Sequence, residues 1–129
     1  PAGRAVPGPA RLDAAEVVRA VQAEMLPLDR NLFRTRAGLR RSLASLDALW
    51  DRVASEGVAG AGRERLRARS AAAMAAHARW CYRAALAREE SRGLHRLEGL
   101  PTLPRFEHRL LTGGLDDPWT AAEPLEVPA

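Results

Sequence analysis

The sequence contains no lysine and no isoleucine, has one cysteine and lacks any long apolar run. All 20 basic residues are therefore arginines, which suggests a GC-rich coding bias and weakens the formal net charge of +4 as a sign of nucleic-acid binding. The single Cys81 excludes an internal disulfide framework and is typical of a reducing compartment. No segment approaches the ~18 apolar residues of a membrane span. We therefore expect a cytoplasmic protein, or one at the cytoplasmic face of a membrane.

Aromatic residues are also scarce, with three Trp, two Phe and one Tyr, whereas hydrophobic residues make up 47% of the chain. A chain of 129 residues is the size of one domain. Because much of the apolar content is alanine, we expect a core of closely packed helices.

Composition and charge divide the chain into parts. Residues 1–11 are predicted to be a linker, because the first nine positions hold three Pro and two Gly, and they do not resemble a signal peptide. A chain that opens in a linker is expected for a domain excised from a longer protein. Residues 1–96 carry 18 Arg against 10 acids, a net charge of +8, whereas residues 97–129 carry two Arg against six acids, a net charge of −4. We expect the acidic tail to pack on the basic part or on a missing neighbouring domain.

Two segments carry the apolar spacing of amphipathic helices. The first is predicted to begin after Asp13, with Glu16 completing a capping pair, and to end before Pro27. The second is predicted to begin after Thr35 and to end at the glycine-rich turn 57–62. The residues expected to face the core are Ala14, Val17, Val18, Val21 and Met25 in the first helix, and Leu39, Leu43, Leu46, Trp50 and Val53 in the second.

A third helix is predicted from about Arg63 to Ser91. Its middle part is an almost uniformly apolar, alanine-rich run. The residues expected on its inner face are Met74, His77, Trp80 or Cys81, and Ala84. Three amphipathic segments with short connections predict an all-α fold, an antiparallel three-helix bundle over residues 12–96.

Residues 97–129 are predicted to form an extended, irregular acidic tail, since repeated prolines rule out a long helix there. A hairpin is the regular element that this tail could contain. Residues 106–112 and a stretch around Trp119 would pair across Gly113-Gly114.

The residues give no convincing catalytic, cofactor-binding or metal-binding site. His77 and Cys81 lie four apart and would share a helix face, but no third or fourth ligand stands at a diagnostic spacing. Gly113-Gly114 has no following helix, and the glycine-rich turn 57–62 has no preceding strand, so neither predicts a phosphate-binding loop.

The stretch AREESRGLHR, residues 87–96, is the exception. Glu89 and Glu90 would fall in the last turn of the third helix, where the helix dipole disfavours carboxylates. Two explanations stay open. The acids could pair with Arg83 or Arg88 on the surface, or the whole stretch could make hydrogen bonds across a junction with another domain.

Residues 88–95 (REESRGLH) resemble the R-x-E-S-R-G-x-H signature near the end of flavoproteins of the succinate dehydrogenase, fumarate reductase and L-aspartate oxidase type. Upstream, Met25, Phe33-Arg34 and Gly38-Leu39 are similar to a second family segment, so the resemblance covers roughly residues 13–110. The family commonly continues Arg-x-Asp-(Tyr/Phe)-Pro after the histidine, whereas this chain reads RLEGLP over residues 96–101.

The resemblance implies the C-terminal helical scaffolding domain of an FAD-dependent oxidoreductase, with no catalysis by this part alone. The parent would resemble a succinate dehydrogenase or fumarate reductase flavoprotein, and an L-aspartate oxidase is the alternative. FAD would be bound by the preceding domains, and no cofactor by this fragment. Its partners would be the flavin-binding and capping domains of the parent chain, and a partner subunit is a further candidate.

The motif itself is expected to dock on the flavin domain, through Glu89, Glu90, Ser91, Arg92, Gly93 and His95. In an isolated domain such groups would lack their partners. We therefore predict that Glu90, Ser91 and Arg92 find few hydrogen-bond partners within this chain.

A function of a different class also fits the composition. An independent arginine-rich helical module would bind an acidic protein or a nucleic acid, with an affinity that falls steeply with salt. The residues that would carry this binding are Arg40, Arg41, Arg63, Arg65, Arg67 and Arg69. A nucleic-acid partner is not favoured, because no recognised binding motif accompanies the charge.

Overall fold

The computed structural model describes residues 10–124. Its elements are the helices α1 (Ala14–Met25), α2 (Leu28–Asn31), α3 (Arg36–Glu56) and α4 (Glu64–Ala87), the 3-10 turn η1 (Pro104–Phe106), and the strands β1 (His108–Gly113) and β2 (Trp119–Pro124). Most of the predicted linker and the last five residues of the tail lie outside the described residues.

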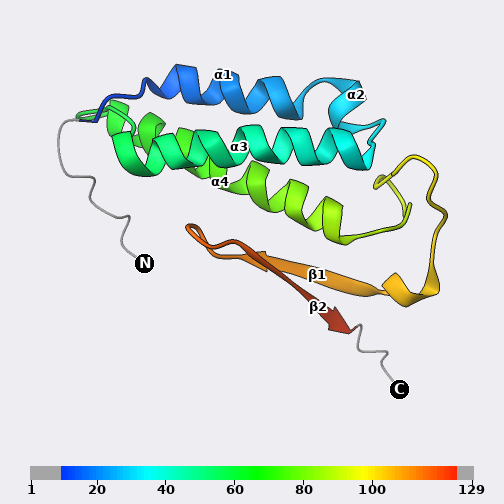
Figure 1. The fold of residues 1–129 in the computed structure, drawn as a ribbon. Coiled ribbons are helices and arrows are strands. Elements are labelled where there is room, and N and C mark those ends of the chain that lie inside the picture. Colours follow the sequence, from blue (N-terminus) through cyan, green and yellow to red (C-terminus); the bar gives the residue numbers. More distant parts are fainter. Residues whose placement is uncertain (1–9, 125–129) are drawn as a thin grey trace.

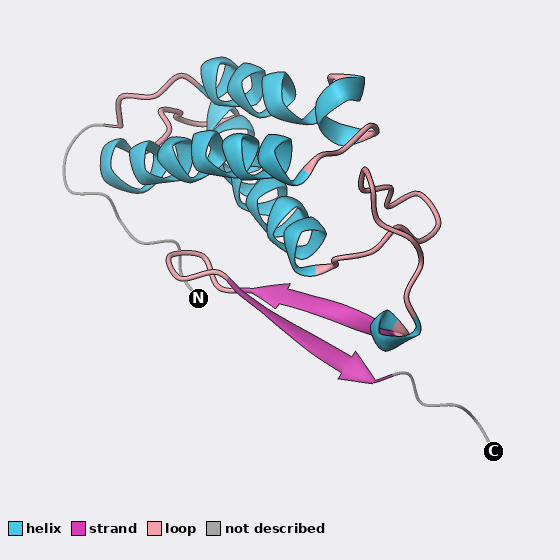
Figure 2. Cartoon of the chain, turned by 45° about the vertical axis from the view of Figure 1, so that its right-hand side comes forward, coloured by secondary structure: helices cyan, strands magenta, loops and turns pink. Residues whose placement is uncertain are grey.

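The three long helices form an up-down-up bundle, as predicted. In Figure 1, α3 runs opposite to both α1 and α4, and α4 packs against each of the other two. The strands β1 and β2 form an antiparallel hairpin that lies along α4, as Figure 2 also shows. The fold is therefore a bundle of three long helices, with the short helix α2 between the first two and a hairpin in the tail.

The predicted inner faces of the first two helices are confirmed. Val17 and Val21 of α1 are buried, as are Leu39, Leu46 and Val53 of α3. The remaining residues predicted for these faces, Ala14, Val18, Met25, Leu43 and Trp50, are partly buried and pack against the same core. A spacing of three and four therefore identified the core side of both helices.

Only one of the two predicted helix caps is formed by a side chain. Thr35 Oγ1 accepts a hydrogen bond of 2.9 Å from the amide of Gly38, which satisfies an otherwise unpaired donor. Asp13 occupies the cap position of α1, but its side chain makes no capping hydrogen bond. The expected pair with Glu16 is wrong, because the Glu16 carboxylate lies 3.2 Å from Arg52 Nη1 of α3 instead.

The inner face predicted for the third helix is wrong. Met74, His77 and Cys81 are exposed, and α4 is buried through another stripe. That stripe consists of Ala68, Ala71, Ala75, Ala76, Ala78, Arg79, Tyr82 and Ala85. In a run that is apolar on every side, side-chain size does not identify the core face, since Tyr82 is buried and Met74 is exposed. Most of the buried stripe is alanine, because small side chains let the backbones of neighbouring helices approach closely.

The third helix also ends earlier than predicted. It stops at Ala87, and Arg88 is already extended, with φ −88° and ψ 92°. Glu89 and Glu90 therefore lie beyond the helix, outside the last turn where the dipole would oppose them. The electrostatic conflict that the sequence suggested does not exist.

The hairpin is held on α4 by two side chains that reach backbone carbonyls at its turn. Arg79 is 4% exposed; its Nε donates to Asp47 Oδ1 at 2.6 Å and its Nη1 donates to the Leu115 carbonyl at 2.7 Å. Trp80 Nε1 donates to the Gly114 carbonyl at 2.7 Å. At this contact, backbone carbonyl oxygens of the tail therefore accept hydrogen bonds from side chains of α4.

We expect Gly114→Ala to destabilise the hairpin more than Gly99→Ala does. Both glycines have positive φ, 78° and 75°, and a side chain costs roughly 1–2 kcal/mol in that conformation. At Gly114 an added Cβ would also lie 2.2 Å from the Asp117 carbonyl oxygen, whereas at Gly99 it would meet nothing within 4 Å. Thermal unfolding of the two variants measures the difference. Equal losses would show that the steric contact is relieved at no cost.

Candidate functional site

The segment after α4 folds into a compact loop, residues 88–103, which we call the motif corner. Figure 1 shows it crossing from the end of α4 past the start of α3 before it continues to η1 and β1. It contains all six residues that the sequence assigned to domain docking.

Glu90 lies at the centre of the motif corner and is completely buried. Its Oε1 accepts hydrogen bonds from Arg88 Nη1 at 2.8 Å and from Arg92 Nε at 2.7 Å. Its Oε2 accepts from Arg92 Nη2 at 3.2 Å and from the Leu103 amide at 2.7 Å. A buried carboxylate is tolerated when opposite charges and hydrogen bonds surround it, and both conditions hold here.

The environment of Glu90 strongly favours its ionised form. The hydrogen bond from Arg92 is the largest cause, and the Leu103 amide and Arg88 act in the same direction. Burial opposes them, but the pKa of Glu90 still falls from 4.5 to about 2. The hydrogen bond with Glu90 in turn raises the pKa of Arg92.

The two arginines extend this network to the rest of the tail. Arg88 Nη1 donates to the Phe106 carbonyl at 2.8 Å and its Nη2 donates to the His108 carbonyl at 2.7 Å. Arg92 Nη2 donates to the Leu103 carbonyl at 3.1 Å. Arg88, held by the Glu90 carboxylate, thus connects the end of α4 to η1 and to the first residue of β1.

Ser91 is also satisfied within the chain. Its hydroxyl donates to the Leu97 carbonyl at 3.1 Å and accepts from the Leu97 amide at 3.0 Å. Its own amide donates to the Pro101 carbonyl at 3.1 Å, and its carbonyl accepts from Thr102 Oγ1. The serine therefore closes the loop from residue 91 to residue 102.

A tight turn with Gly93 at φ 58° presents His95 to the α2–α3 connection. The backbones of Arg92 and His95 bond to each other at 2.8 and 3.0 Å. His95 Nδ1 lies 3.0 Å from Arg34 Nη1, and its Nε2 lies 3.0 Å from the Arg88 carbonyl. Because a guanidinium only donates, Nδ1 must accept, so the imidazole is neutral and carries its proton on Nε2. Burial lowers the pKa of His95, and the positive charges of Arg34 and Arg88 lower it further.

These contacts overturn the prediction that Glu90, Ser91 and Arg92 would find few partners within the chain. All three are hydrogen-bonded internally, so the motif's charges build the corner itself. The assignment of the six motif residues to domain docking stays a prediction, since no partner domain is part of this chain. Arg34 and Leu103 were missed as members of the network, since Arg34 lies 61 residues from His95 and Leu103 contributes only its backbone.

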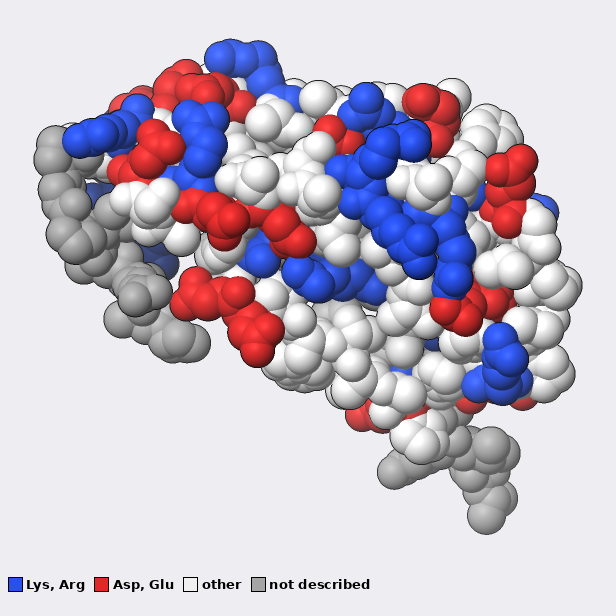
Figure 3. Space-filling model, viewed as in Figure 1, with Lys and Arg blue, Asp and Glu red and all other residues white. Residues whose placement is uncertain are grey.

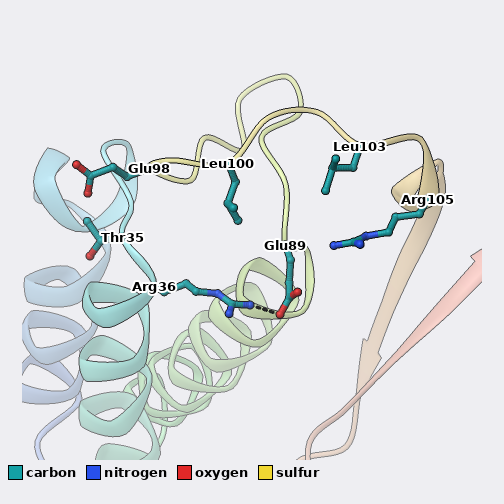
Figure 4. A pocket seen from close by; sticks show the side chains of 7 residues that line it. All are labelled: Thr35, Arg36, Glu89, Glu98, Leu100, Leu103 and Arg105. Carbon is teal, nitrogen blue, oxygen red and sulfur yellow. Dashed lines mark hydrogen bonds and ion pairs between the residues drawn. The ribbon is translucent and has the colours of Figure 1, made fainter.

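Glu89 behaves differently from its neighbour. It forms an ion pair with Arg36 at the start of α3, and both side chains are about half exposed, at 46% and 41%. Figure 4 shows this pair at the edge of an open hollow of about 320 Å³, with Arg105 reaching toward it from η1 and with Glu98 and Thr35 on the far side. Opposite charges are balanced in this hollow, which gives it no clear preference for an anion or a cation.

The other residues considered from sequence do not assemble into a site. His77 and Cys81 are both exposed, and in residues 10–124 no group of three or more His, Cys, Asp or Glu residues could hold a metal ion. His77 Nδ1 bonds to the Ala73 carbonyl at 2.8 Å, and its ring packs edge-on against Trp80. Gly113 and Gly114 serve the hairpin turn.

The arginines proposed for an independent binding module are exposed but do not form one uniform surface. They are Arg40, Arg41, Arg63, Arg65, Arg67 and Arg69. Arg67 pairs with Glu64 at 3.1 Å. Figure 3 shows acidic and basic side chains interspersed over the face in view. Mixed charge of this kind does not resemble the continuous basic stripe of a nucleic-acid-binding protein.

We expect Glu90→Gln to destabilise the domain far more than Glu89→Gln. The first change leaves two guanidiniums without a buried anion, whereas the second removes one half-exposed ion pair worth at most about 1 kcal/mol. Acid titration supplies a second readout. The folded pKa of Glu90 is below its ordinary value, so the stability that it contributes is present above pH 4.5 and is lost as the pH falls toward about 2.

Denaturant unfolding from pH 7 to pH 2 checks both expectations. Glu90→Gln should lack the part of the acid loss that the wild type and Glu89→Gln share. Similar effects of the two substitutions at pH 7 would contradict the central place of Glu90.

His95 predicts a second and earlier loss of stability in acid. Its folded pKa is lowered from 6.5, so the unfolded chain takes up a proton first as the pH falls below 6.5. The stability that neutral His95 contributes is therefore present above pH 6.5 and declines below it. His95→Gln retains an acceptor and a donor but cannot titrate, so its free energy of unfolding should be flat where that of the wild type declines. Parallel declines between pH 6.5 and 5 would refute this assignment.

None of the helices in the described part of the chain is long and apolar enough to cross a membrane.

Comparison of the sequence with known proteins identifies the family of this chain. No curated protein matches the sequence. The family model described as the fumarate reductase flavoprotein C-terminus matches residues 22–119, which include the whole motif corner and most of the bundle. The chain belongs to the family of fumarate reductase and succinate dehydrogenase flavoprotein C-terminal domains.

Proposed function

We propose that this chain is a scaffolding domain that packs against the flavin-bearing part of an FAD-dependent oxidoreductase and does no chemistry alone. The parent would be of the succinate dehydrogenase or fumarate reductase type, in line with the family description. An L-aspartate oxidase parent stays as the alternative, because the motif resembles both.

The observation that carries this proposal is the buried network around Glu90. Its three partners, Arg88, Arg92 and the Leu103 amide, fix the motif corner to the end of α4, and the carbonyls bound by Arg88 fix it to β1. A loop fixed in this way has little freedom to reorganise, which suits a rigid support more than a flexible lid. The corner thus holds three elements in one arrangement.

The internal bonds of His95 and Ser91 support a role of the motif without catalysis. His95 uses both ring nitrogens in internal bonds, and the Ser91 hydroxyl both donates to and accepts from Leu97. A general base or a nucleophile needs an atom that can reach a substrate. In this proposal FAD and the substrate are bound by the preceding domains, and hydride transfer takes place there.

Titration of the purified chain with FAD tests the division of labour. We expect no saturable change in flavin fluorescence or in tryptophan fluorescence at micromolar FAD, because Glu90, Arg92 and His95 of the motif already use their polar groups in bonds within the chain. Tight, stoichiometric binding of FAD by these residues alone would refute the proposal.

A further inference from the structure

Five large apolar side chains remain exposed at one end of the bundle. They are Leu26, Leu28, Leu32, Phe33 and Leu94, with exposed fractions of 68%, 64%, 40%, 70% and 88%, and we call them the corner patch. The first four lie on the connection from α1 through α2 to α3, and Leu94 lies at the tip of the Gly93 turn. Figures 1 and 2 both show this connection and the motif corner side by side. Apolar side chains gathered in this way usually mark an interaction site.

The motif corner holds the two halves of this patch together. The bond between His95 Nδ1 and Arg34 Nη1 places the turn that carries Leu94 beside the segment that carries Phe33. The Glu98 amide also donates to the Arg34 carbonyl at 2.9 Å. The patch is therefore preformed, which lowers the entropy lost when a partner binds.

A hollow of about 410 Å³ borders the patch. Leu32 and Phe33 of the patch line it together with Leu97, and Arg96 and Glu98 line it as well. Both charged residues are exposed, and neither makes an ion pair within residues 10–124. An apolar centre with one charge of each sign at its edge is typical of a protein–protein interface. An anionic lipid surface would repel Glu98.

We propose that the corner patch is the docking surface for the flavin-bearing part of the parent flavoprotein. Leu94 and Phe33 enter an apolar recess there, and the partner surface places a carboxylate opposite Arg96 and a cation opposite Glu98. This inference rests on the proposed function. It assigns docking to the apolar tip of the turn, whereas Glu90, Arg92 and His95 are positioning residues that shape the surface from inside.

The family match favours this occupant over a second copy of the chain. The patch lies wholly within residues 22–119, the part that matches a family described as the C-terminal part of a flavoprotein. In such a protein the flavin-bearing part belongs to the same chain, so it is present at a high effective concentration and outcompetes a separate molecule.

The test uses the full-length flavoprotein that contains this domain, with a photoreactive benzophenone side chain at position 94. The matched control carries the same group at position 66, because Leu66 is 72% exposed but lies in the first turn of α4, at the other end of the bundle. We expect position 94 to cross-link to a peptide of the flavin-bearing part and position 66 not to do so. Cross-links from position 94 to a second copy, or none at all, would overturn the proposal.

The substitutions Leu94→Ser and Phe33→Ser measure the energetic contribution, with Leu66→Ser as the control. In the full-length flavoprotein, each patch variant should open the junction between this domain and the flavin-bearing part about tenfold more often, the effect of losing one buried large apolar side chain, as measured by hydrogen exchange of the amides that the junction buries. The control should leave this exchange unchanged. Equal exchange in all three variants would also overturn the proposal.

Deletion of residues 22–124 from the parent separates this inference from the proposed function. If the deleted protein retains its flavin and full activity, the scaffolding role itself fails. If deletion abolishes flavin retention while the patch variants behave as the control does, the scaffolding role stands and the corner patch is the wrong surface.

Discussion

The buried carboxylate of Glu90 is the constraint on which the geometry of the chain after α4 depends. A glutamate without solvent contact is stable only if its charge is matched, and here two guanidiniums and one backbone amide match it. The two arginines then use their remaining donors on carbonyls of η1, β1 and the loop before them. The forked guanidinium makes this possible, because one side chain can bind a carboxylate and a carbonyl at once.

The same principle recurs at the hairpin turn. Arg79 is nearly buried between Asp47 of α3 and the Leu115 carbonyl, and its guanidinium lies over the ring of Trp50 at 5.3 Å. Arg83 binds the same Asp47 carboxylate at 3.0 Å. One buried and one partly buried ion network thus anchor the tail, while the alanine-rich face of α4 packs in the bundle core.

Local sequence patterns predicted much of the fold and little of the site. The stripes of α1 and α3, the Thr35 cap and the hairpin across Gly113-Gly114 follow from local rules, and all are present. The inner face of α4 was not predictable in this way, because an alanine-rich run is apolar on every side and the packing of its neighbours decides which alanines are buried.

The motif corner shows the limit of sequence reasoning more clearly. The resemblance located residues 88–95 and the family, but the partners of Glu90 and His95 come from distant positions and from backbone groups. Neither leaves a signal in the local sequence. The same limit hid the corner patch, because bonds between residues far apart in the sequence bring the segments of Leu94 and Phe33 together.

The reliance on guanidinium groups gives the fold a one-sided response to pH. A lysine ammonium would lose its charge near pH 10.4, whereas an arginine keeps its charge over the whole pH range in which proteins stay folded. Burial also raises the pKa of Tyr82, whose hydroxyl donates to the Glu24 carbonyl between α4 and α1. These networks therefore keep their charges at alkaline pH, and only protonation at low pH weakens them.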